Sequence, residues 1–188
     1  MTNTRLFAAI AVAAFACGAA LWHFGHPVGS RAGVTTTSTP PAPVPAIAPT
    51  ALYAAAFTDP EGASRSLGQF QGRVLVLNFW ATWCGPCRAE MPAFSRLHSR
   101  WAARGVQFLG LSDEPPSTAA RFGRDLAIAY PLWTGGEQVL DLSRRLGNHQ
   151  RVLPHTVIVG PSGEVLEQRV GPYTEDELDS MLRRFSSK

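Results

Sequence analysis

The sequence contains few cysteines, which argues against a fold held together by several disulfides. Only three of the 188 residues are cysteine, and one of them, Cys17, lies in an apolar N-terminal segment. The other two are too few to staple a domain of this size, and with 45% hydrophobic residues the chain has enough apolar material for an ordinary core. We therefore expect Cys84 and Cys87 to serve chemistry or metal binding and not a disulfide scaffold.

Acidic residues are missing from the first 58 positions, which makes the whole chain look more basic than its folded part. The formal net charge is +3, but residues 51–188 hold 15 basic and 14 acidic side chains. The sequence also lacks a basic stripe with interleaved aromatic residues, the pattern typical of nucleic-acid binding. We therefore expect no nucleic-acid partner.

The N-terminal segment lacks charge over a long stretch. Residues 6–24 form an uncharged run of 19 residues, against about 20 for a membrane-spanning helix and about 7–15 for the apolar core of a signal peptide. Residues 1–26 are therefore interpreted as an export signal or membrane anchor, and the length favours a retained anchor. Release after cleavage stays open, because Ala14-Phe15-Ala16 has the small-residue pattern of a cleavage site.

Residues 27–50 show no hydrophobic periodicity and are rich in proline, alanine, threonine and serine. Such a segment cannot bury enough apolar surface to fold alone, and its prolines keep the chain extended. We expect a linker here, followed by one folded domain over 51–188.

The most informative motif is Trp83-Cys84-Gly85-Pro86-Cys87. It directly follows the apolar run 74–80, which predicts a buried strand, and it opens a helix expected over 85–104. Cys84 would then lie at the helix N-terminus, where free backbone N–H groups and the helix dipole favour the thiolate. Cys87, one turn further, is placed to attack a mixed disulfide on Cys84. The motif predicts thiol–disulfide exchange, with Cys84 as the nucleophile and Cys87 as the resolving thiol.

A CxxC pair alone also occurs in zinc sites and at haem attachment sites. A zinc site normally needs further Cys or His ligands at suitable spacing, and haem attachment needs a His directly after the second cysteine. Arg88 occupies that position here. We therefore predict no metal and no cofactor.

The other elements are expected from apolar periodicity and turn residues. Strands are expected over 52–57, 106–111, 156–159 and 165–170, a hairpin turn region over 62–72, and helices over 118–126, 139–146 and from Thr174 onward. The order is βαβα followed by ββα, which predicts an α/β domain.

With this order of elements, the chain resembles the TlpA-like or ResA-like thiol–disulfide reductases, which are membrane-tethered proteins of the thioredoxin fold. The resemblance covers about 52–185 and rests on 67–73, 78–92 around the CxxC motif, 153–156 and Gly171. It implies a thioredoxin-like fold, with a central mixed β-sheet flanked by helices and an N-terminal hairpin extension.

The resemblance also assigns roles to individual residues. Leu153-Pro154 corresponds to the family's cis-proline dipeptide, whose preceding backbone pairs with an extended substrate. Glu90, three residues after the second cysteine, corresponds to a proton acceptor in a branch that has an asparagine, here Asn78, where thioredoxin has a buried aspartate. The alternative for Glu90 is a surface carboxylate paired with an arginine such as Arg96.

Substrate contacts are expected around the two thiols. Trp83 would offer an apolar surface beside the nucleophile. Gly85-Pro86 is the dipeptide of thioredoxin itself and indicates a low reduction potential, typical of a reductase. His155 either contacts substrate or makes an ordinary hydrogen bond at a strand edge. The candidate site therefore consists of the catalytic residues Cys84, Cys87 and Glu90 and the substrate-binding residues Trp83, Gly85, Pro86, Leu153, Pro154 and His155.

By this resemblance we expect an exported reductase in the bacterial periplasm or at the outer face of the cytoplasmic membrane. Its clients would be proteins with disulfides or CxxCH thiols, in cytochrome c maturation or copper-site assembly. An oxidising compartment keeps the pair as a disulfide, so a membrane thiol reductant must supply electrons. Two alternatives stay open: a disulfide oxidase or isomerase on the same fold, and a copper chaperone using Cys84, Cys87 and His155, since Cu(I) prefers soft thiolates.

Overall fold

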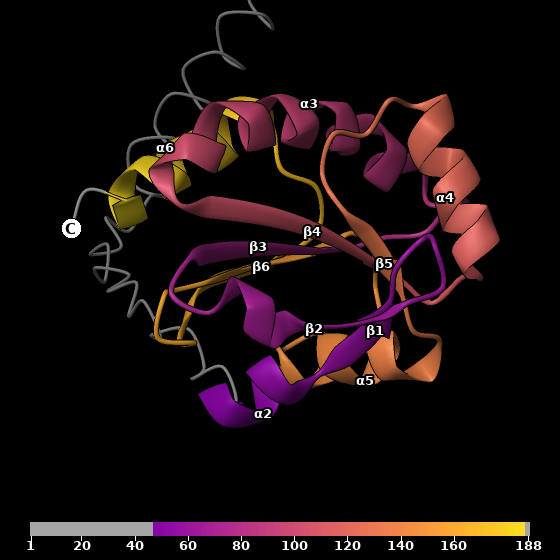
Figure 1. Ribbon diagram of the computed structural model, residues 1–188. Coiled ribbons are helices and arrows are strands. Elements are labelled where there is room, and N and C mark those ends of the chain that lie inside the picture. The colour runs from indigo at the N-terminus through magenta and orange to yellow at the C-terminus, as the bar shows by residue number, and fades with distance from the viewer. Residues whose placement is uncertain (1–46, 187–188) are drawn as a thin grey trace, which may run out of the picture. The chain divides into compact units, whose positions relative to one another are not determined.

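The computed structural model describes residues 47–186, which form a seven-stranded mixed sheet with helices on both faces (Figure 1). The anchor or signal expected over 1–26 lies outside the described residues, as does most of the linker expected over 27–50. Within the described part of the chain, no helix is long and apolar enough to cross a membrane.

Three parallel strands form the centre of the sheet. β4 lies between β3 and β5 and is parallel to both. β6 and β7 extend the sheet antiparallel beyond β3, and the hairpin of β1 and β2 extends it beyond β5, in the order β2-β1-β5-β4-β3-β6-β7. The strands are β1 (Ala56–Thr58), β2 (Ser64–Ser66), β3 (Val74–Phe79), β4 (Val106–Ser112), β5 (Leu132–Thr134), β6 (His155–Val159) and β7 (Val165–Val170). The mixed sheet and its N-terminal hairpin confirm the expected fold class.

Helices cover both faces of this sheet. Figure 1 shows α3, α4 and α6 over one face and α2 and α5 over the other. The helices are α2 (Pro49–Ala54), α3 (Gly85–Trp101), α4 (Pro116–Asp125), α5 (Glu137–Arg145) and α6 (Glu175–Ser186), with short 3₁₀ turns at Leu67–Phe70 and Ala102–Arg104. The helix expected over 85–104 is therefore confirmed as α3 and the 3₁₀ turn after it.

The alternation of side chains along the strands divides the core into two parts. Val76 and Trp80 of the β3 region pack under α3, whereas Leu77 and Phe79 pack on the α5 side. Asn78 therefore falls on the α3 face. The same alternation in β6, which pairs antiparallel with β3, decides which candidate site residues can meet.

The strand expected over 52–57 is wrong in its first half. Residues Pro49–Ala54 form α2, and the strand begins only at Ala56. Pro49 suits the first turn of a helix, where the missing N–H is not needed. Leu52 and Tyr53 are consecutive and both buried, which does not match the alternation of a strand with one exposed face.

The strand β5 is absent from the sequence-based expectation. It has only three residues, and all of them are buried. A run this short and uniformly buried carries no alternation, so only its pairing with β4 and β1 identifies it as a strand.

Candidate active site

Cys84 and Cys87 form a disulfide at the start of α3. Cys84 is the N-cap residue of the helix, and its Sγ accepts a hydrogen bond of 3.2 Å from the backbone N–H of Cys87. Cys87 is fully buried, whereas Cys84 keeps 4% of its surface exposed. The structure thus places both thiols at the strand-to-helix junction predicted from the sequence, and it gives the Cys84 sulfur a helix N–H donor that also favours a thiolate.

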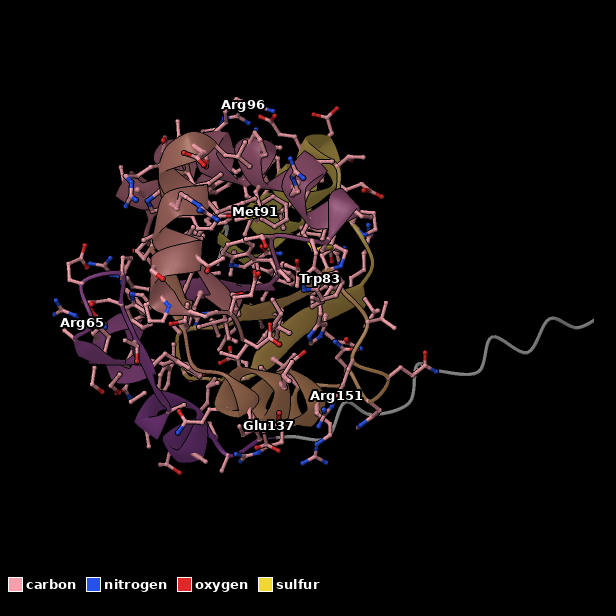
Figure 2. The ribbon with its side chains drawn as sticks, turned by 90° about the vertical axis from the view of Figure 1, so that its right-hand side faces the viewer. Arg65, Trp83, Met91, Arg96, Glu137 and Arg151 are labelled. Carbon is pink, nitrogen blue, oxygen red and sulfur yellow. A yellow bond between two sulfur atoms is a disulfide. The ribbon has the colours of Figure 1, made fainter. Side chains whose placement is uncertain are left out.

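The residues around Cys84 are open to solvent. Trp83 is 72% exposed and, in Figure 2, lies on the face turned to the viewer. Gly85 and Pro86 are also exposed. Trp83 and the turn between the thiols therefore form exposed surface next to Cys84 in the chain.

Glu90 lies one turn after Cys87 and is only 4% exposed, so it is not the surface carboxylate of the alternative interpretation. Its Oε1 accepts a 2.9 Å hydrogen bond from Nδ2 of Asn78, and its Oε2 accepts one of 2.9 Å from the backbone N–H of Tyr173. Burial raises the pKa of Glu90 to about 7, against the lowering effect of these two donors. A carboxyl with this pKa can take up and release a proton at neutral pH.

Two further residues surround the Glu90 carboxylate. Asn78 also donates to Oγ1 of Thr156 at 3.2 Å, so the amide links α3 to β6, where Thr156 faces Asn78 in register. Tyr130 is buried nearby, and its pKa lies well above the usual range, first because of burial and then because of the Glu90 charge. Tyr130 therefore stays protonated at neutral pH and cannot accept the proton that Glu90 takes up.

The Leu153–Pro154 peptide bond is cis, as the resemblance implies. Leu153 packs against the part of the core that contains both cysteines. The carbonyl of Pro154 accepts a 2.8 Å hydrogen bond from the N–H of Gly171, but the backbone N–H and C=O of Leu153 have no partner among residues 47–186.

His155 lies on the opposite face of the sheet from Glu90. It is fully buried and stacks on Phe79, with the ring centroids 5.2 Å apart. Its Nδ1 lies 3.0 Å from Oγ of Ser143, and its Nε2 lies 3.2 Å from Oε1 of Gln168. Burial lowers the pKa of His155 to about 4.

This position favours the second of the two expectations for His155, an ordinary hydrogen bond, over contact with a substrate. His155 is the first residue of β6, and its neighbour Thr156 takes the face that carries the proton site. The imidazole therefore makes ordinary hydrogen bonds inside the core. The set of Cys84, Cys87 and His155 that a copper chaperone would use is not assembled, and the described residues hold no group of three or more His, Cys, Asp or Glu suited to a metal.

Glu114 is a site residue for which the sequence offers no signal. Its Oε2 accepts from the backbone N–H of Thr82 and its Oε1 from the Thr82 hydroxyl, both at 2.6 Å. The backbone N–H of Glu114 in turn donates to Oγ of Ser112 at 3.2 Å. Because Thr82 lies two residues before Cys84, Glu114 fixes the loop that leads into α3.

Known proteins are similar to this chain in sequence and in fold. The AhpC/TSA family matches residues 47–168. Thiol-disulfide oxidoreductase ResA of Bacillus thuringiensis is 29% identical over 130 residues, which cover 69% of this chain and 73% of the relative. The ResA of Geobacillus kaustophilus is 30% identical over 128 residues, covering 66% of this chain and 70% of the relative.

The fold is that of the thioredoxin family. A thiol:disulfide interchange protein from Chlorobium tepidum, described as a thioredoxin family protein, has a TM-score of 0.63 and 24% identity, and the match covers 79% of this chain and all of that one. The disulfide at the start of α3 occupies the strand-to-helix junction of this fold. The chain belongs to the AhpC/TSA family and is a ResA-like thiol–disulfide oxidoreductase with a CxxC pair.

Proposed function

We propose that this protein reduces disulfides of client proteins, with Cys84 as the nucleophile, Cys87 as the resolving thiol and Glu90 as the proton carrier. The observation that carries the proposal is the buried Glu90 carboxyl, one helical turn beyond Cys87, with a pKa of about 7. Asn78 orients this carboxyl but cannot itself accept a proton through its amide nitrogen. Proton transfer from the buried resolving thiol is thus left to Glu90.

The first step joins the enzyme to its client. The Cys84 thiolate attacks one sulfur of the client disulfide, which forms a Cys84–client bond and breaks the client's S–S bond. The other client sulfur leaves as a thiolate and takes a proton from solvent. The exposed Trp83 and the free backbone groups of Leu153 support this step, since they provide an apolar surface and a partner for an extended client segment.

The second step releases the client. Glu90 takes the proton of Cys87, whose thiolate attacks the Cys84 sulfur and forms the Cys84–Cys87 disulfide seen in the structure. The second client sulfur leaves as a thiolate and receives its proton from Glu90. In each cycle the client gains two electrons and one proton from the enzyme and a second proton from solvent, so an external dithiol must reduce the enzyme again. A membrane thiol reductant, as in the family that the sequence resembles, suits this role.

The N-terminal sequence supports a location outside the cytoplasm. The apolar residues 6–24 suit an export signal or anchor, and the proline-rich residues 27–50 suit a spacer that holds the domain away from the membrane. By resemblance, the clients are the CxxCH cysteines of apocytochromes c or a protein of copper-site assembly.

A synthetic peptide tests this function. A peptide with an intramolecular disulfide in a Cys-Ala-Ala-Cys-His segment is incubated with the dithiol form of the protein, and peptide thiols are counted over time. We expect reduction that depends on Cys84 and slows when Glu90 is changed to Gln. Oxidation of the reduced peptide by the disulfide form, with no reaction in the reducing direction, would instead favour a disulfide oxidase.

A further inference from the structure

The side-chain amide of Asn148 holds the backbone of Val152 through two hydrogen bonds. Its Oδ1 accepts from the N–H of Val152 at 3.0 Å, and its Nδ2 donates to the C=O of Val152 at 2.8 Å. Asn148 is 2% exposed and follows the end of α5. The residue that it holds opens the segment Val152–Pro154, called here the cis-proline segment.

A buried chain of hydrogen bonds supports this amide. Asn148 Nδ2 also donates to Oγ of Ser143 at 3.1 Å, and Ser143 Oγ contacts Nδ1 of His155. The carbonyl oxygen of Gln168 can only accept, which assigns the imidazole proton to Nε2 and leaves Nδ1 to accept from the Ser143 hydroxyl. The chain therefore joins α5 to the residues on both sides of Leu153–Pro154, Val152 before it and His155 after it.

The backbone before the cis-proline segment is held in an unfavourable conformation. Arg151 has a φ of 54°, in the left-handed region that a residue with a Cβ seldom adopts. Such a residue persists where its surroundings fix it. Asn148 supplies that restraint on both sides, because its backbone C=O accepts from the N–H of Arg151 at 3.2 Å and its side chain binds the next residue.

The restraint leaves the outer side of the segment open. Val152 is 43% exposed, and the backbone N–H and C=O groups of Leu153 have no hydrogen-bond partner among residues 47–186. Among the described residues, the exposed large apolar side chains are Trp83, Val152 and Val170. Trp83 adjoins Cys84, Val152 opens the cis-proline segment, and Val170 pairs in register with His155, the residue after Pro154.

We propose that Asn148 is a positioning residue that fixes the cis-proline segment for pairing with an extended client and presents Val152 as an apolar contact for it. The inference rests on the proposed function and deepens it by naming the substrate class. The preferred client is an extended peptide with an apolar side chain close to the target disulfide. Asn148 itself touches no substrate and acts through Val152.

The test compares two reactions of the full-length protein. Dithiothreitol reduces the Cys84–Cys87 disulfide without needing the cis-proline segment, whereas a disulfide peptide flanked by Leu uses it. For Asn148→Ala we expect kcat/KM for the peptide to fall by roughly tenfold, mainly through KM, while the dithiothreitol rate changes by less than about twofold. The matched control is Asp179→Asn, a buried polar residue that bonds Trp101 away from the thiols.

A surface variant tests the apolar contact without disturbing the core. Val152→Ser keeps the backbone bonds to Asn148, and we expect it to lower kcat/KM for the Leu-flanked peptide about threefold to tenfold while a Ser-flanked peptide is unaffected. If Asn148→Ala does not fold, the Val152→Ser variant still tests the proposed contact with the client.

Three results would overturn the inference. In the first, Asn148→Ala slows both reactions equally or the control slows peptide reduction as much, so that the role is structural. In the second, Val152→Ser has the wild-type kcat/KM for both peptides, which would show that Val152 makes no apolar contact with the client. In the third, the wild type reduces neither peptide, and the proposed function fails as well, a result distinct from loss in the variants alone.

Discussion

Asn78 and Glu90 meet in the interior through a hydrogen bond of 2.9 Å that joins β3 to α3 beneath the CxxC disulfide. The amide donor favours the ionised carboxyl, whereas burial favours the neutral one. Burial has the larger effect, so the pKa of Glu90 is raised to about 7. The pair therefore provides a proton acceptor close to neutrality and a neighbour that orients it without competing for the proton.

Replacing Glu90 with Gln tests this role. The amide fills the same space but cannot take the proton of Cys87, so we expect turnover to fall about 100-fold and to lose its dependence on a group that titrates near pH 7. Steady-state rates from pH 5.5 to 8.5 measure both effects. The control is Asp179→Asn, which changes another buried carboxyl remote from the thiols. Equal loss in both variants, or a retained pH dependence in Glu90→Gln, would contradict the role.

Glu90 and His155 affect the pH dependence of stability in opposite directions. The folded pKa of Glu90 is about 7, above its ordinary 4.5, so its contribution to the free energy of unfolding falls as pH rises from 4.5 to 7. The folded pKa of His155 is about 4, below its ordinary 6.5, so its contribution falls as pH drops from 6.5 to 4. Each effect amounts to about 3 kcal/mol over its window, and between pH 4.5 and 6.5 the two nearly cancel.

Denaturant unfolding at pH 4.5 and 6.5 checks this cancellation. From the lower to the higher pH, we expect the free energy of unfolding of Glu90→Gln to rise by about 3 kcal/mol more than that of the wild-type protein. The expected change for His155→Gln has the opposite sign. Parallel pH profiles in the wild type and Glu90→Gln would show that Glu90 does not titrate as described.

Thr82 and Glu114 provide a prediction about stability. Thr82→Val preserves the shape of the side chain but removes the hydroxyl that donates to Oε1 of Glu114 at 2.6 Å. This carboxylate oxygen then loses its hydrogen-bond donor. We expect the oxidised protein to lose about 1–3 kcal/mol of unfolding free energy in urea. Thr118→Val, on α4, is the matched control and should change stability by less than about 0.5 kcal/mol. Similar losses in both variants would mean that the contact with Glu114 contributes nothing specific.

The two cysteines should differ when each is replaced by Ser. Cys87→Ser keeps the nucleophile but removes the resolving thiol, so mixed disulfides between Cys84 and a client peptide should accumulate. Cys84→Ser should form none and should have no reductase activity. Mass spectrometry of peptide adducts under non-reducing conditions separates the two outcomes, and adducts that form through Cys87 would reverse the assigned roles.

The sequence is informative wherever local pattern decides the structure. The apolar run 74–80, the CxxC motif and the turn after Val159 predict β3, α3 and the β6–β7 hairpin, because each carries its own periodicity or turn residues. The cis bond at Leu153–Pro154 is anticipated only through the family resemblance. Local physics alone would treat Pro154 as an ordinary turn residue.

The remaining features depend on contacts that the sequence does not encode locally. The strand expected from Thr156 begins one residue earlier, at His155, and this single residue gives the imidazole a defined face away from the thiols. The two hydrogen bonds between Asn148 and Val152 depend on the backbone between them, where Arg151 has a positive φ that no local pattern predicts. Glu114 reaches Thr82 across a separation of 32 residues, which no periodicity signals.

The reduction potential of the Cys84–Cys87 couple tests the central claim most directly. It is measured with the full-length protein in thiol–disulfide buffers, with tryptophan fluorescence as the readout. A reductase with thioredoxin's Gly-Pro between its cysteines should have a potential near thioredoxin's, at about −270 mV. A potential near about −120 mV, as in strong oxidants, would contradict the account and make the protein a disulfide donor.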